Sequence, residues 1–264
     1  MSQQPSIAII IVSRNRPDLV ERSVKHFEQD SYPNKEILVV ECGTDAQNLS
    51  PYPTISYTDD DFKGKCFGHN VGLNYLNMQK TYDYYLFCMN DVYVNDKTDF
   101  LAEMIDVMET NPRLGCMSPA EKDSDYPGAR PKGSGLRPVT TSDYLFLFMR
   151  GEVVQKYGFF NHTFKYCWGA IHEYSYKLYR DDWFMAYYDG LDYLHLGGTT
   201  YGAKNTKTIS REQYQINAKR FAYNYFVEQY GENWDTEFWD VATKHHDIEH
   251  NTYSKHRTYW AGAL

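Results

Sequence analysis

The chain has 264 residues, of which 42% are hydrophobic and 23% charged, and its formal net charge is −8. This length suffices for one large domain or two small ones, and the negative charge argues against a nucleic-acid or anionic-membrane partner. No apolar run approaches the roughly 20 residues of a membrane span, and five scattered cysteines without CxxC spacing indicate a reducing compartment and no disulfides. We therefore expect a soluble, cytoplasmic protein.

The first 119 residues alternate between apolar strands and helices. Residues 6–13 are a continuous β-branched run, typical of a strand buried on both faces of a parallel sheet. A helix that begins near Pro17 and a second buried strand over 35–43 follow, which is the order of a right-handed βαβ unit. The other elements expected here are a short strand over 53–61, a glycine-punctuated loop running into a helix over 64–79, a strand over 82–94, a helix over 98–112 and a strand over 114–119. In such α/β sheets, ligands bind at the carboxyl ends of the strands.

The second half begins with residues 120–138, whose Pro, Gly, Lys, Asp and Ser content predicts a mobile surface loop. A helix is predicted over 210–231, with Ser210 and Gln213 as a capping box and Gly231 as its stop. Between these segments we expect a strand and helix over 144–160, a loop entering a helix over 166–182, and a strand and turn over 193–202. The residues after 231 read as a polar tail rich in histidine and aromatics.

Asp91 lies where the buried strand over 82–94 is interrupted by Asn90–Asp91. A carboxylate at the carboxyl end of a central strand can hold a divalent cation, which in turn can neutralise a diphosphate. The alternative is that Asp91 caps the following turn through its side chain. Taken alone, Asp91 favours the turn cap.

Seven short segments occur along the chain in an order typical of one enzyme family. They are IIIVSRNRPDLVERSV, EILVVECGTD, FGHNVGLN, YYLFCMNDV, NPRLGCMSP, GEVVQKYGFFN and YLHLGG. Together they resemble the GT-A glycosyltransferases, in particular the inverting, family-2-like branch, over roughly residues 5 to 202. This resemblance implies a Rossmann-like α/β fold with a mixed, mostly parallel sheet flanked by helices. The nucleotide-binding half would be 1–119 and the acceptor half 120–205, within a GT-A domain 1–205 followed by a C-terminal helical extension, 206–264.

The resemblance also implies a nucleotide pocket. Ser13, Arg14 and Asn15 would line it at the end of the first strand, and Glu41 would contact the base, usually uracil, with Asp45 nearby. Asn15 has the alternative role of a turn or cap residue, and Glu41 and Asp45 that of a solvated loop.

A second group of residues would meet the sugar and the phosphates. Asn70 would lie in the loop that contacts ribose and phosphate, although it too can be a turn or cap residue. Asp91 would bind Mn²⁺ or Mg²⁺, with His195 as second ligand. The first aspartate of the family's DxD motif falls on Met89, which cannot accept a hydrogen bond from a ribose hydroxyl, and Asn90 would replace it in part.

The catalytic base is the other departure from the family pattern. Inverting members carry Glu-Asp, often after Trp-Gly-Gly, whereas this chain reads WGAIHEYSYKL. Glu173 is predicted to be the base, with His172 and Asp143 as the other candidates. The alternative for Glu173 is a charge that complements the dipole of the first helical turn.

Three further features give weaker indications of function. Trp168 suits stacking on an acceptor sugar or a place in the core. Lys204 and Lys207 would meet phosphates or be solvated. His246 and His250, at i and i+4, are a possible metal pair on a helix.

The predicted function is metal-dependent transfer of a sugar from a nucleotide-sugar donor, expected to be UDP-linked, to a glycan or other hydroxyl acceptor with inversion. One alternative is a catalytically impaired nucleotide- or glycan-binding protein of the same fold. The other is a nucleotidyltransferase, although the SRNRPD turn lacks the glycines of a triphosphate loop.

Overall fold

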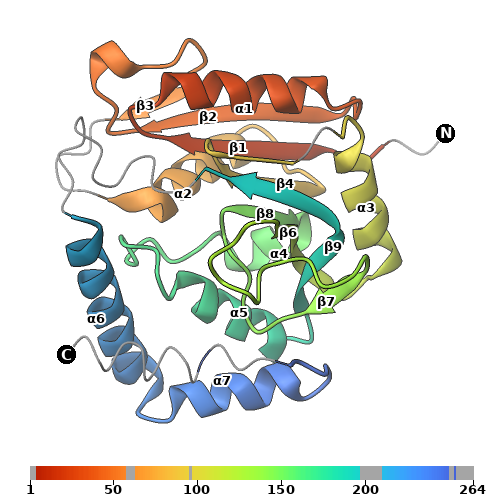
Figure 1. Cartoon of the computed structure of the whole chain (residues 1–264), viewed down its shortest axis with the longest axis vertical. Helices are drawn as coiled ribbons and strands as arrows, with labels where there is room; N and C mark the ends of the chain where they lie inside the picture. Colours follow the sequence, from red (N-terminus) through yellow and green to blue (C-terminus); the bar gives the residue numbers. More distant parts are fainter. Residues whose placement is uncertain (1–3, 58–62, 95–96, 197–209, 250–252, 254–264) are drawn as a thin grey trace.

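The computed structural model describes residues 4–57, 63–94, 97–196, 210–249 and 253 (Figure 1). The described helices are α1 (Pro17–Gln29), α2 (Gly64–Asn77), α3 (Phe100–Thr110), α4 (Gly151–Tyr157), α5 (Ala170–Arg180), α6 (Arg211–Tyr230) and α7 (Trp234–Thr243), with a 3₁₀ turn η1 (Ala46–Asn48). The described strands are β1 (Ile7–Ser13), β2 (Lys35–Cys42), β3 (Ile55–Tyr57), β4 (Tyr84–Met89), β5 (Val92–Val94), β6 (Leu114–Glu121), β7 (Leu136–Pro138), β8 (Phe146–Arg150) and β9 (Phe184–His195). The mixed α/β class expected from the sequence is confirmed.

All described strands belong to one sheet, in the order β3-β2-β1-β4-β8-β6-β9-β5, with β7 paired to β9. Strands β3, β2, β1 and β4 are parallel, as the βαβ pattern predicted. Strand β8 runs antiparallel to both β4 and β6, so β6 has the direction of β4, and β9 is parallel to β6. The carboxyl ends of β1, β2, β4, β6 and β9 therefore meet at one edge of the sheet.

The predicted strand over 82–94 is wrong in one respect, because it is two strands. The ladder of β4 with β1 ends at Met89, and β5 pairs antiparallel with β9, with Val92 opposite His195. Val-Tyr-Val resumes the strand pattern after Asn90–Asp91, so the sequence shows an interruption but not a change of partner strand. The sequence also missed β7, inside the predicted loop, and α7, inside the predicted tail.

Strand β9 is irregular where it passes β6. Pro119 pairs with Tyr188, but the next residue of β6, Ala120, pairs with Asp192. Three residues of β9, 189–191, are thus extra relative to β6. Beyond them the pairing resumes with Glu121 opposite Tyr193.

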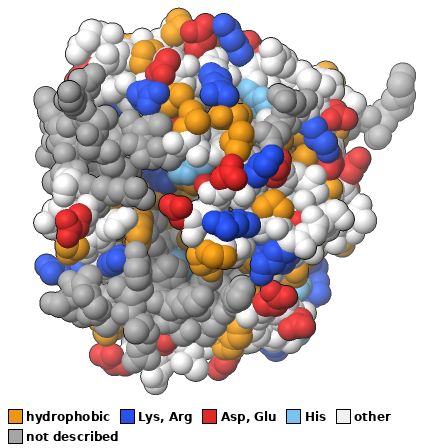
Figure 2. Space-filling view, in the orientation of Figure 1, with side chains coloured by type: hydrophobic (Ala, Val, Ile, Leu, Met, Phe, Trp, Pro, Cys, Tyr) orange, Lys and Arg blue, Asp and Glu red, His pale blue; other side chains and the backbone are white. Residues whose placement is uncertain are grey.

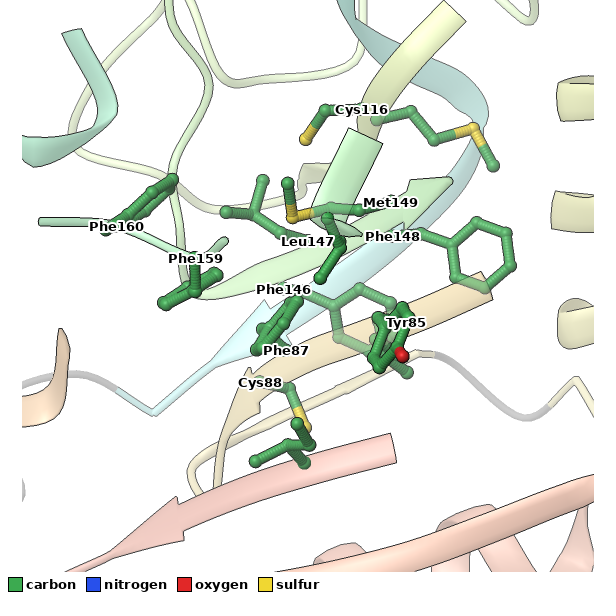
Figure 3. Packing of buried hydrophobic residues seen from close by; sticks show 14 of the residues in the cluster. Tyr85, Phe87, Cys88, Cys116, Phe146, Leu147, Phe148, Met149, Phe159 and Phe160 are labelled. Atoms are coloured by element: carbon green, nitrogen blue, oxygen red, sulfur yellow. The ribbon is translucent and has the colours of Figure 1, made fainter. Parts of the chain in front are cut away.

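Aromatic side chains fill the core on both sides of the sheet (Figure 3). On one face, Phe27 of α1 contacts Phe100 of α3 and stacks on Phe146 of β8. On the other, Phe87 of β4 stacks on Phe159 with ring centroids 3.9 Å apart. Burial of side chains this large dominates the energetics of a core, and here it fixes the strands that carry the carboxyl edge.

Helix α2 packs closely on β1 and β2 because it carries glycines at the contact. A Cβ on Gly72 would lie 2.7 Å from Ile10, and one on Gly68 would lie 2.4 Å from the Cys42 sulfur. Side chains at these positions would push the helix off the sheet. The predicted loop before the helix is absent among the described residues, since α2 already begins at Gly64.

Gly64→Ala is expected to lower the free energy of unfolding by about 2 kcal/mol or more. Gly64 has φ +77°, and its Cβ would lie 1.9 Å from the backbone oxygen of Lys165, which cannot rotate away. Urea denaturation followed by circular dichroism measures the change. Gly133→Ala is the control, because a Cβ there meets no atom within 4 Å, and equal stability of the two variants would contradict this packing.

Two further observations concern features predicted from composition. The five cysteines are buried, which agrees with the reading of Cys42, Cys88 and Cys116 as small core residues. Among the described residues, no helix combines the length and the apolar character that crossing a membrane requires.

Candidate functional site

The carboxyl edge of the sheet collects charged side chains from five strands. In Figure 1 the arrows of β1 and β9 point toward this edge, and β4 is parallel to β1. On the face shown in Figure 2, acidic and basic side chains and a histidine lie together beside a hollow near the middle of the molecule.

Asp91, the residue before β5, faces His195, the last residue of β9. The side-chain oxygen Oδ2 of Asp91 lies 3.5 Å from Nε2 of His195, and Nδ1 of the same ring lies 3.2 Å from Oε1 of Glu121. His195 is therefore held between two carboxylates, one at each ring nitrogen. Burial lowers the pKa of His195, but its contacts with Asp91 and Glu121 outweigh this and raise the pKa to about 9.

A second carboxylate pair continues from Glu121. Asp143, just before β8, interacts with Glu121, and the Tyr187 hydroxyl accepts a hydrogen bond from the Asp143 backbone N–H at 2.8 Å. The same hydroxyl donates to Oδ2 of Asp143 at 3.4 Å. Burial and the charge of Glu121 raise the pKa of Asp143 to about 6. Lys65, whose ammonium lies 3.6 Å from the ring centroid of Tyr144, is the nearby cation that opposes this shift.

Glu121 was not among the site residues predicted from the sequence. Its position could have been predicted, because the SPAE segment ends β6 at the same edge at which Asp91 follows β4. Its contact with His195 could not, because that contact depends on the pairing of β6 with β9.

A divalent cation would fit between Asp91 and His195 once it displaces the Nε2 proton that the raised pKa of His195 retains at neutral pH. Two ligand atoms each about 2.1 Å from one ion stand roughly 3.0 to 3.4 Å apart, close to the 3.5 Å between Oδ2 and Nε2. Glu121 at Nδ1 fixes the ring so that Nε2 faces Asp91, an arrangement common for metal-bound histidines. Within the described ranges no three His, Cys, Asp or Glu residues form a metal-binding group, so diphosphate and water would have to supply the remaining ligands, as is usual for Mg²⁺.

The residues predicted to form the nucleotide pocket are linked by hydrogen bonds. Asn15 adopts φ 55°, and its Oδ1 accepts from the backbone N–H of Asp45 at 2.8 Å. Its own N–H donates to the Thr44 hydroxyl at 3.2 Å, and that hydroxyl donates to Glu41 at 2.7 Å. The turn after β1 and the loop after β2 are thus one network.

Glu41 is completely buried rather than part of a solvated loop. Besides Thr44, its carboxylate accepts from the backbone N–H of Ser50 at 3.2 Å. Ser13 is buried and accepts from the Asn90 side-chain amide at 3.0 Å, which joins the ends of β1 and β4. Arg14 is half-buried in the bend that follows β1.

Asn70 lies inside α2 rather than in a loop. Its amide donates to the backbone oxygens of Cys66 at 2.8 Å and Phe160 at 2.7 Å. The side chain therefore ties α2 to the segment before α5. This contact agrees with the structural alternative for Asn70 rather than with a ribose contact.

Asp91, Glu121 and Asp143 form a carboxylate cluster around His195. Glu173 and His172 face the C-terminal helices instead of this cluster. Glu173 Oε1 accepts from the hydroxyls of Tyr225 at 2.6 Å and Tyr230 at 3.0 Å, both on α6, and Oε2 lies 3.2 Å from Lys177. His172 is buried, with its ring against Phe226. These contacts argue against the catalytic role predicted for Glu173 and leave Asp143 as the candidate beside the cluster.

Glu173→Ala is expected to lower the free energy of unfolding by about 2 kcal/mol, because two tyrosine hydroxyls and a lysine lose a buried partner. Chemical denaturation measures this loss. Glu228→Ala, at an exposed position of α6, is the control. A stable Glu173→Ala protein with strongly reduced turnover would instead restore Glu173 as the base.

The remaining candidates lie away from the cluster or outside the described residues. Trp168 is half-buried, with the Lys219 ammonium 5.9 Å from its ring centroid. His246 packs against Tyr179 and Phe184. The other candidates, Lys204, Lys207 and His250, fall outside the described residues.

Neither a protein-family model nor a curated protein sequence matches the chain. Solved structures do match. The mannosyltransferase PcManGT from Pyrobaculum calidifontis, in complex with GDP-Man and Mn²⁺, aligns with a TM-score of 0.61 at 14% identity, covering 99% of this chain and 74% of its own. S. aureus TarS 1–349 in complex with UDP aligns with a TM-score of 0.62 at 13% identity, covering 98% and 79%.

A third similar structure is GalNAc-T7 with UDP, GalNAc and Mn²⁺, which aligns with a TM-score of 0.61 at 10% identity. The alignment covers 98% of this chain and 57% of that one. These are GT-A-type glycosyltransferases, and the likeness extends over almost the whole chain. The chain therefore has the GT-A fold.

Proposed function

We propose that the protein is a metal-dependent glycosyltransferase that moves a sugar from a UDP-linked donor to a hydroxyl acceptor such as a glycan, with inversion. The observation that carries this proposal is the 3.5 Å approach of Asp91 and His195 at the carboxyl edge of a GT-A sheet. Mn²⁺ or Mg²⁺ at that pair would neutralise the departing diphosphate. The complexes of similar folds with GDP-Man, UDP and Mn²⁺ support the choice of ligands.

The chain's own residues have separate tasks in this proposal. Ser13, Asn15 and Glu41 border the nucleotide site through the network that joins the ends of β1 and β2. Asp143 takes the proton of the acceptor hydroxyl as it attacks the anomeric carbon. Its pKa of about 6 leaves the carboxylate ionised at neutral pH and still able to accept a proton. Tyr187 orients Asp143 through both of its hydrogen bonds.

The experiment that tests this function is calorimetry with UDP in the presence and absence of Mn²⁺, joined to an assay of UDP-sugar hydrolysis and transfer. Metal-enhanced UDP binding together with turnover is the expected result. Failure to bind any nucleotide diphosphate with either metal would overturn the proposal.

A second candidate function is nucleotide or glycan binding without catalysis. Met89 is the observation that favours it, because a thioether occupies the place of the first DxD carboxylate. Metal-dependent UDP binding without turnover on any donor would select this alternative. A nucleotidyltransferase has less support, since the SRNRPD turn after β1 contains no glycine.

A further inference from the structure

A cavity of about 400 Å³ lies beside the carboxylate cluster, at β7 and β9. One side is formed by the segment from Tyr126 to Thr141, another by Tyr187 and Asp189 of β9, and residues 247–249 after α7 border it as well. Its size is in the range of small-ligand sites. None of the residues assigned to the nucleotide site lines it.

The cavity is built on a buried ion pair. Arg137 makes two hydrogen bonds to the Asp189 carboxylate, at 2.9 and 3.0 Å, and the side chain of Asp189 is 4% exposed. The guanidinium also donates to the backbone oxygen of Gly128 at 2.8 Å, which holds the loop above the cavity in place. A bidentate arginine pair of this kind is geometrically specific, so the wall is preorganised.

The lining selects a neutral, hydroxyl-rich ligand. Its two basic residues, Arg137 and Lys132, already pair with Asp189 and Glu249, the second pair at 2.9 Å. An anionic ligand would have to compete with these carboxylates. The exposed ring of Tyr126 offers an apolar face and the exposed carboxylate of Asp247 a polar edge, which is the combination that suits a sugar ring.

One side chain, that of Tyr187, contacts both the cavity and the proposed base, Asp143. Tyr187 lines the cavity, and its hydroxyl makes both hydrogen bonds to Asp143. Burial raises the pKa of Tyr126, the charge of Asp143 adds to this rise, and the charge of Arg137 opposes it. Because Tyr187 stands between the cavity and Asp143, a ligand here sits next to the reacting centre and not on it.

We propose that this cavity binds a sugar unit of an oligosaccharide acceptor, at a distance from the hydroxyl that reacts. The proposal rests on the proposed transferase function, and it gives the C-terminal extension a task, since residues 247–249 close one side. The acceptor class proposed is therefore a neutral glycan of two or more sugar units.

The test uses the labelled full chain on an array of neutral mono- to tetrasaccharides of hexoses and N-acetylhexosamines, with UDP calorimetry in parallel. Tyr126→Ala is expected to weaken oligosaccharide binding about tenfold, because it removes an aromatic platform that is 37% exposed. Asp247→Asn, a small change at an exposed lining position, is the second variant and is expected to weaken binding as well. Tyr75→Ala is the matched control, since Tyr75 is 40% exposed on α2 and does not line the cavity.

Oligosaccharide binding that is lost in Tyr126→Ala and kept in Tyr75→Ala supports the subsite. The subsite is overturned if the wild-type protein binds no neutral glycan or binds peptides alone. It is also overturned if Tyr126→Ala and Asp247→Asn both bind oligosaccharides with wild-type affinity. Intact UDP binding in that case leaves the transferase function standing. Absent UDP binding overturns the function itself, whatever the array shows.

Discussion

Asp91→Asn is expected to remove the Mn²⁺-dependent part of UDP binding and to lower turnover by at least about 100-fold. Asparagine keeps the shape of the side chain but lacks the negative charge that draws a divalent cation to the end of β4. Asp91 is 7% exposed and lies opposite His195, so no other described carboxylate occupies its place next to Nε2. Calorimetry with UDP at fixed Mn²⁺ and a UDP-release assay measure the two effects.

Asp106→Asn is the matched control, because Asp106 is exposed on α3 and carries the same substitution away from the carboxyl edge. It should leave both measurements unchanged. Metal-enhanced UDP binding that survives in Asp91→Asn would place the cation elsewhere. The role proposed for the Asp91–His195 pair would then be wrong.

Asp143→Asn is expected to lower the turnover number by about 10² to 10⁴-fold, the range of a lost general base, while leaving the affinity for UDP unchanged. The wild-type rate should rise through pH 6. Asp143 has a pKa of about 6, so the acid form that dominates below this pH cannot take a proton from the acceptor. The rising limb of the pH–rate profile should be absent in the variant.

Glu173→Ala completes this comparison. It removes a carboxylate bound by Tyr225 and Tyr230, and it should reduce stability without shifting the pH–rate profile. If Asp143→Asn retains the wild-type rate while Glu173→Ala loses it, the assignment of the base is reversed. The two variants together therefore separate catalysis from folding.

Much of the nucleotide-binding half could be predicted because its signals are local. Each buried strand is a continuous apolar run, so the positions of Ser13, Glu41 and Asp91 at strand ends followed from the sequence alone. Parallel pairing then brings those ends to one edge. The capping of α6 was equally local, and the Ser210 hydroxyl accepts from the Gln213 N–H as the capping box requires.

The acceptor side was harder to predict because its contacts are long-range. Whether Glu173 faces a substrate or α6 depends on where α6 packs, and nothing within WGAIHEYSYKL reports this. The same holds for Glu121, which reaches His195 only because β6 pairs with β9. By contrast, α7 could have been found, since Trp234, Phe238 and Ala242 recur at a spacing of four and are buried.

The three extra residues of β9 help to set the direction in which His195 points. Pro119 and Ala120 are consecutive in β6 and point to opposite faces of the sheet, so their partners Tyr188 and Asp192 do the same. Four positions apart in a regular strand, these two residues would share one face. The bulge at residues 189–191 therefore shifts the alternation once and brings the end of β9 back into phase with β6. A segment that carries none of the predicted site residues thus places His195 opposite Val92 and next to Asp91.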